Sequence, residues 1–205
     1  MDKEFHQQLE QSYSRYKSAK EIKDLCYRAL IDSYRRVKDV VGIAKLDENN
    51  IRNQFIIDLE TKNEIVGHAL ENHIIRIIPE SCDLVKRKRP DIVFFIPHIC
   101  DLTFECKKLT SDEDRYLNDG LIRFIRLDYA EKEDEAGMIG FILDSSIPSK
   151  LKKKVSSFHC IRLIDKPVLD FLNSFWSKHT CQNSKQILIS HLFFYFSKNK
   201  HTILD

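Results

Sequence analysis

The chain has 205 residues, of which 42% are hydrophobic and 31% are charged, with only 5 Gly and 5 Pro. This balance excludes a fibrous or low-complexity protein and predicts one folded domain, with room for a helical extension but not for two full domains. The formal net charge of +2 does not identify a nucleic-acid-binding protein by itself, so a surface for nucleic acid would have to be formed by local clusters of basic residues.

The start of the chain and its cysteines indicate a cellular compartment. The sequence MDKEFHQQLEQ is charged from its first residues and lacks the apolar core of a secretory signal, and the chain has no 18-residue apolar run that could span a membrane. The 6 cysteines form no CxxC pair, which predicts free, buried thiols in a reducing compartment. We therefore expect a cytoplasmic protein. His179, Cys181 and His191 lack the paired spacing of zinc ligands, and we interpret them as strand and loop residues.

Residues 3 to 41 contain no Gly or Pro and carry apolar side chains at helical spacing. The pattern predicts one long helix or a helical pair with Gly42 as the C-cap, and we take residues 1 to 44 as an N-terminal helical extension. Its amphipathic character fits packing on the core. The alternative is a dimerisation arm or a helix that docks a partner.

Residues 45 to 205 read as the main domain. A second helix is predicted to begin at Asp47, a good N-cap residue, with a continuation or a further helix over 63 to 75. Two short runs rich in β-branched and aromatic residues, 93 to 96 and 102 to 106, predict a β-hairpin with a loop of about five residues.

The remainder of the chain alternates helix and strand. We expect a helix with a glycine inside it over 117 to 129, a strand at 138 to 143, a short helix at 166 to 176 and a final strand at 187 to 196. This order predicts an α/β or α+β fold with a mixed central sheet flanked by helices.

The hairpin threads charged residues through apolar runs, although burying charge is costly unless the charges are paired or hold a metal. Side chains alternate along a strand, so Glu105 and Lys107 share one face while Phe104 and Cys106 lie on the other. Antiparallel pairing brings Asp91 opposite the Glu-Cys-Lys stretch. Two adjacent carboxylates suit Mg²⁺ or Mn²⁺, and a nearby lysine can orient a metal-bound water or stabilise charge that develops on a phosphate.

Pro90-Asp91, thirteen residues and then Glu105-Cys106-Lys107 resemble the PD-(D/E)xK signature of the restriction-endonuclease-like nucleases. The resemblance covers roughly residues 45 to 196 and implies a core of helix, hairpin, third strand, helix and further strand. It implies that Asp91 and Glu105 bind metal, that Cys106 lends its backbone carbonyl, and that Lys107 assists the nucleophilic water. It also implies a further acidic ligand on the first helix, for which Glu48 is the best match and Glu60 and Glu64 are the fallbacks.

Taken singly, these residues have ordinary explanations. An Asp after Pro is usually a turn residue, and an E-x-K on a strand is usually a solvated ion pair at a sheet edge. Their joint placement on two apolar strands favours an active site. The stretch with Tyr116, Gly120, Arg123, Phe124, Tyr129 and then AGMIGFIL is similar to small bacterial nuclease-like proteins, some of them linked to phage defence.

Basic residues near the motif are candidates for phosphate contacts, which position nucleic acid without reading its sequence. The run Lys86, Arg87, Lys88, Arg89 directly precedes the motif, and Arg123 is either a phosphate clamp or an ordinary surface arginine. The lysines between 150 and 154 are interpreted as solvated surface.

These observations predict a Mg²⁺-dependent (or Mn²⁺-dependent) nuclease whose expected substrate is DNA rather than RNA, and which acts as an endonuclease rather than an exonuclease. A role as a phage-defence effector and dimerisation through the N-terminal helix belong to the same expectation. Two alternatives stay open. One is a catalytically silent module that binds nucleic acid or a partner protein, and the other is an effector that is inactive until a sensor partner arrives.

Overall fold

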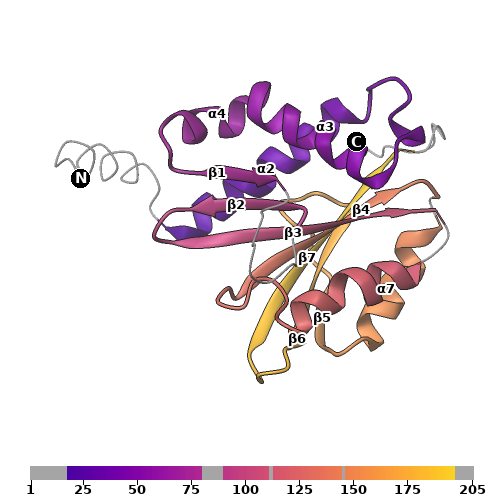
Figure 1. The fold of residues 1–205 in the computed structure, drawn as a ribbon. Coiled ribbons are helices and arrows are strands. Elements are labelled where there is room, and N and C mark those ends of the chain that lie inside the picture. Colours follow the sequence, from indigo (N-terminus) through magenta and orange to yellow (C-terminus); the bar gives the residue numbers. More distant parts are fainter. Residues whose placement is uncertain (1–17, 80–89, 111–112, 145, 197–205) are drawn as a thin grey trace.

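A mixed seven-stranded sheet lies at the centre of the computed structural model, with helices on both faces (Figure 1). The structure describes residues 18–79, 90–110, 113–144 and 146–196. The helices are α2 (Ala19–Val37), the 3-10 turn η1 (Ile43–Lys45), α3 (Glu48–Thr61), α4 (Glu64–Glu71), α5 (Glu113–Arg115), the π-helical η2 (Tyr116–Leu121), α6 (Ile122–Ile125) and α7 (Ile147–Ser157). The strands are β1 (Arg76–Pro79), β2 (Ile92–Ile96), β3 (Cys100–Leu109), β4 (Glu135–Ile142), β5 (Cys160–Ile164), β6 (Ser174–Thr180) and β7 (Gln186–Tyr195).

The strands run in the order β1-β2-β3-β4-β7-β6-β5. The two central pairings, β3 with β4 and β4 with β7, are parallel, whereas the outer pairings are antiparallel. The parallel centre is buried on both faces, as parallel strands require. The expected mixed sheet flanked by helices is therefore confirmed at the level of an α+β fold.

Two hydrophobic clusters divide the core between the faces of the sheet. Residues of α2, α3 and α4 pack against one face, where Phe104 and Cys106 point. Residues of η2, α6 and α7 pack against the other face, with Leu109 and Met138. Figure 1 shows α3 and α4 on one side of the sheet and α7 on the opposite side. The odd-numbered β3 side chains, Glu105 and Lys107 included, therefore share the face covered by η2 and α6.

Helix α2 forms part of the main core. Ser18 caps it by accepting a hydrogen bond from the Glu21 N–H, and the helix buries Tyr27 and Leu30. The packing interpretation is thus confirmed for residues 19 to 37. The helix ends at Val37 rather than at Gly42, which instead adopts a φ of 80° ahead of η1. Residues 3 to 17 lie outside the described residues, and an interface through this segment stays a prediction.

The predictions for α3 and the hairpin are confirmed. Asp47 caps α3 by accepting a hydrogen bond from the Asn50 N–H at 2.8 Å. Strands β2 and β3 pair antiparallel, but the loop between them spans only residues 97–99, because Cys100 already pairs with Ile96. His98 adopts a φ of 63°, which a loop this tight requires.

One assignment in the C-terminal half was wrong, and three elements there, α7, β5 and β6, were not predicted. Residues 166 to 176 do not form a helix, because Leu169 and Asp170 adopt positive φ angles of 48° and 64°. The Ser174 hydroxyl closes this turn by accepting a hydrogen bond from the Val168 N–H, and β6 begins at Ser174. Helix α7 was not predicted because Pro148 suggested a strand boundary, yet proline is well accommodated in the first turn of a helix.

Two further findings concern the apolar character of the helices and the state of the cysteines. Within the part of the chain that the structure describes, no helix combines the length and apolar character needed to span a bilayer. The described cysteines are free thiols, and Cys26, Cys106 and Cys181 among them are buried, while Cys82 lies outside the described residues.

Candidate active site

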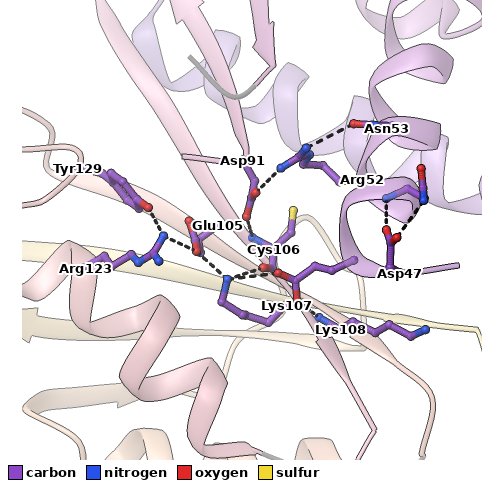
Figure 2. Close-up of polar contacts among 12 residues, drawn as sticks. Asp47, Arg52, Asn53, Asp91, Glu105, Cys106, Lys107, Lys108, Arg123 and Tyr129 are labelled. Atoms are coloured by element: carbon purple, nitrogen blue, oxygen red, sulfur yellow. Dashed lines mark hydrogen bonds and ion pairs between the residues drawn. The ribbon is translucent and has the colours of Figure 1, made fainter. Parts of the chain in front are cut away.

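The hairpin brings Asp91 to Glu105 and its neighbours, as the strand pairing predicted. Asp91 precedes β2, and its N–H donates to the Phe104 carbonyl at 3.2 Å. Its side chain turns toward β3, where Oδ2 accepts a hydrogen bond from the Cys106 N–H at 2.7 Å (Figure 2). A local backbone contact therefore fixes the orientation of this carboxylate.

Glu105 and Lys107 lie side by side on one face of β3, also as predicted. Lys107 Nζ lies 2.7 Å from Glu105 Oε1 and 2.9 Å from the Cys106 carbonyl oxygen. Both side chains are buried, with 2% of the Glu105 side chain and 7% of the Lys107 side chain exposed. Gly120 of η2 lies above this pair, and a Cβ there would stand 2.5 Å from Met138 Cε and 3.6 Å from Lys107 Cγ. The glycine thus lets the π-helical turn lie close over Met138, next to the stem of Lys107.

Helix α3 contributes two residues from one of its faces. Glu48 Oε2 accepts a hydrogen bond from the Lys108 N–H at 2.7 Å, and Glu48 Oε1 lies 3.5 Å from Lys107 Nζ. Arg52, one helical turn later, places Nη1 2.7 Å from Asp91 Oδ1. The structure thus brings Glu48 to the motif. The fallback residues Glu60 and Glu64 are exposed on α3 and α4.

Arg123 reaches the same place from α6. Its Nη1 lies 3.1 Å from Glu105 Oε1, and the same nitrogen donates to the Tyr129 hydroxyl (Figure 2). With 38% of its side chain exposed, Arg123 lies between the buried carboxylate and solvent. The basic run 86 to 89 lies outside the described residues.

The sequence alone assigned no role at the site to Arg52 or Tyr129. Arg52 follows Glu48 by four residues, and this helical spacing is a signal that could have placed both on the side of α3 that faces the hairpin. Tyr129 carries no such signal, because its contact with Arg123 depends on how the chain turns after α6.

The carboxyl of Glu105 has a raised pKa. Burial, and then the neighbouring charge of Asp91, raise the pKa of its carboxyl to about 7 despite the opposing effect of Lys107 and Arg123. Burial by itself would lower the pKa of Lys107, but the charges of Glu105 and Glu48 outweigh it and the pKa is raised. Glu105 Oε2 is buried, and among the described residues it has no hydrogen-bond partner.

We refer to six residues as the charged cluster: Glu48, Arg52, Asp91, Glu105, Lys107 and Arg123. Its three carboxylates contact three cations, so its formal charges cancel. Among the described residues, no group of three or more His, Cys, Asp or Glu side chains is arranged to hold a metal ion.

A second polar group, the histidine chain, crosses the core under η2 and consists of Tyr116, His191, Ser177 and His179. The Tyr116 hydroxyl lies 2.9 Å from His191 Nδ1, and Ser177 Oγ lies 2.6 Å from His191 Nε2 and 2.7 Å from His179 Nε2. His179 Nδ1 lies 3.2 Å from the His159 carbonyl oxygen. All four side chains are buried.

The histidine chain has a single self-consistent direction. The His159 carbonyl only accepts, so His179 Nδ1 carries the proton and its Nε2 accepts from Ser177. Ser177 then accepts from His191 Nε2–H, and His191 Nδ1 accepts from the Tyr116 hydroxyl. Burial lowers the pKa of His179 to about 4 and holds that of His191 well below its usual range, which keeps both rings neutral as this direction requires. His179 and His191 are strand residues and Cys181 follows β6, as predicted.

Comparisons with known proteins return no match to a protein family, to a curated protein or to a solved structure.

Proposed function

We propose that this protein is a Mg²⁺-dependent nuclease with a restriction-endonuclease-like core that hydrolyses phosphodiester bonds in DNA. The observation that carries the proposal is Glu105 Oε2, a buried carboxylate oxygen without a hydrogen-bond partner among the described residues. An unsatisfied buried oxygen is costly and rare unless function requires it. A divalent cation bound to the Glu105 carboxylate would satisfy it.

The donor types at the site suit such an ion, although among the described residues the three carboxylates are not arranged to hold one. Asp91, Glu105 and Glu48 offer carboxylate oxygens and Cys106 offers a backbone carbonyl, and Mg²⁺ and Mn²⁺ prefer these hard oxygen ligands. When bound, the ion would polarise the phosphoryl group and lower the pKa of a water molecule.

The other residues of the charged cluster have roles that follow from their contacts. Lys107 holds a buried ammonium next to Glu105, where it can hydrogen-bond an oxygen on which negative charge grows. Arg123 is half-exposed and presents a guanidinium that can bind a backbone phosphate in bidentate fashion. Arg52 orients Asp91 through its 2.7 Å contact with Oδ1.

The order of elements also supports the proposal. Helix α3, the β2–β3 hairpin, strand β4, helix α7 and strand β7 occur in the order expected of that core, with α4 and β1 inserted before the hairpin, α5 to α6 before β4, and β5 and β6 before β7. Strand β4 pairs parallel to β3 on the side away from the hairpin.

One observation favours a second candidate function, a catalytically silent module that binds nucleic acid or a partner protein. Each carboxylate of the charged cluster already contacts a cation of the protein itself, so the cluster balances its charge without a metal. A silent module would bind no divalent cation at this place.

Cleavage of supercoiled plasmid by the purified protein in Mg²⁺, in Mn²⁺ and in EDTA tests the proposal. We expect nicking in both metals, none in EDTA, and loss of nicking in Glu105→Gln. Glu60→Gln is the matched control, because it makes the same change on an exposed helix position. Cleavage that persists in Glu105→Gln or in EDTA would contradict the proposal.

A further inference from the structure

The ammonium of Lys107 lies among the oxygens assigned to metal binding. Its Nζ is 2.7 Å from Glu105 Oε1, 2.9 Å from the Cys106 carbonyl oxygen and 3.5 Å from Glu48 Oε1. An ammonium has three N–H donors, and these three oxygens come from three different residues. Lys107 therefore makes the contacts that a cation at this place would make.

We propose that Lys107 acts as an internal cation that closes the site while no divalent ion is bound, so that metal ion and ammonium compete for the same oxygens. The inference rests on the proposed metal dependence and adds a regulation of the same site. Metal entry then requires Lys107 Nζ to leave Glu105 Oε1 and the Cys106 carbonyl.

The competition follows from charge. Without a cation nearby, the adjacent carboxylates of Asp91 and Glu105 would repel one another in a buried environment. One ammonium offsets part of this repulsion, whereas a divalent ion offsets more of it but has to displace the ammonium first. Lysine suits this role because its charge is a point on a flexible four-carbon stem that can swing away.

The displaced ammonium of Lys107 can move to the substrate. A phosphate of the substrate offers new acceptors, so Lys107 gains contacts when nucleic acid arrives and loses its hold on Glu105. Metal and nucleic acid would then bind with positive coupling, which by linkage acts equally in both directions. The free protein would hold its metal weakly and the complex would hold it well.

Mn²⁺ binding to the full chain, measured by titration with electron paramagnetic resonance at pH 8, tests the inference without relying on activity. We expect Lys107→Met to bind one Mn²⁺ at least about tenfold more tightly than wild type, a change of about 1.4 kcal/mol. We expect the double variant Lys107→Met/Glu105→Gln to lose this site. Lys152→Met removes a lysine charge remote from the charged cluster and should leave the affinity unchanged.

The outcomes separate this inference from the proposed function. Mn²⁺ binding by wild type with no tighter binding by Lys107→Met would overturn the competition and leave the metal-dependent nuclease standing. Absence of Mn²⁺ binding in wild type and in Lys107→Met would overturn both. Lys107→Gln, which keeps a polar side chain in place, gives the same test if the methionine variant fails to fold, and the same tightening is expected.

Discussion

The charged cluster and the histidine chain lie on the same face of the sheet, yet they are built on opposite principles. Glu105 pairs in register with Met138 of β4, and Met138 pairs with His191 of β7, so a single methionine separates them. The histidine chain is neutral, and each of its ring nitrogens has a partner. The charged cluster carries full charges and leaves Glu105 Oε2 without a hydrogen bond.

This difference distinguishes structure from function inside one core. Buried polar groups that serve the fold satisfy one another completely, because an unsatisfied group costs stability and offers nothing in return. A buried carboxylate that keeps one oxygen unsatisfied is expected where a ligand completes it. Under the proposed function the chemistry belongs to the charged cluster, and we expect the histidine chain to stabilise the fold.

The largest effect is expected from Glu105→Gln. The amide keeps the size of the side chain and one oxygen for Lys107 and Arg123, but it removes the negative charge that would bind a cation. We expect metal-dependent cleavage to fall by about 10³-fold or more, with the melting temperature little changed. Plasmid nicking and thermal unfolding measured on the same preparation check this. Wild-type cleavage in the variant would remove the assignment.

Ser177→Ala tests the stabilising role of the histidine chain. The variant leaves the Nε2 atoms of His179 and His191 buried without a partner, which should lower the free energy of unfolding by about 2–4 kcal/mol. Cleavage per folded molecule should not change. Urea unfolding and nicking assays report the two quantities. A stable variant with reduced cleavage would indicate a catalytic role for the histidine chain and contradict the division between the two groups.

The pH dependence of stability sharpens the comparison further. His179 has a pKa of about 4 in the folded protein against 6.5 for an unperturbed histidine, so the unfolded chain binds its proton first as the pH falls. The free energy of unfolding should therefore drop by up to about 3 kcal/mol between pH 6.5 and 4, beyond the change in His179→Gln. Urea unfolding across this range measures it. Parallel pH profiles for the two proteins would show that His179 is not held neutral.

Arg123→Met is expected to have the smallest effect. Arg123 contacts Glu105 and is the half-exposed cation of the charged cluster, so its loss should weaken DNA binding by about tenfold or less and reduce the salt dependence by about one phosphate contact. Fluorescence anisotropy with a labelled duplex in Ca²⁺ at several salt concentrations measures both. An unchanged salt slope would make Arg123 a structural partner of Glu105 only.

The centre of the site could be predicted from the sequence because its geometry is local. Strand alternation alone puts Glu105 and Lys107 on one face, and hairpin pairing alone brings Asp91 opposite them. Asp47 predicts the start of α3 because its side chain caps the helix, and this start makes Glu48 the first helical residue.

The remainder depends on contacts between distant parts of the chain. Arg52 meets Asp91 only because α3 packs across the hairpin, and Arg123 meets Glu105 only because η2 lies close over β3 at Gly120. The histidine chain depends on the register between β6 and β7, which no local pattern announces. The turn at Leu169 and Asp170 was missed for a different reason, since positive φ angles at residues other than glycine leave no clear sequence signal.

The most direct test of the central claim is anomalous X-ray diffraction from crystals of the wild-type protein grown with Mn²⁺ and a short DNA duplex whose scissile bond is blocked. We predict an anomalous peak within coordination distance of Asp91, Glu105 and the Cys106 carbonyl, with Lys107 Nζ moved away from Glu105. A structure with DNA bound, no peak at this place and the Lys107–Glu105 contact intact would contradict the account.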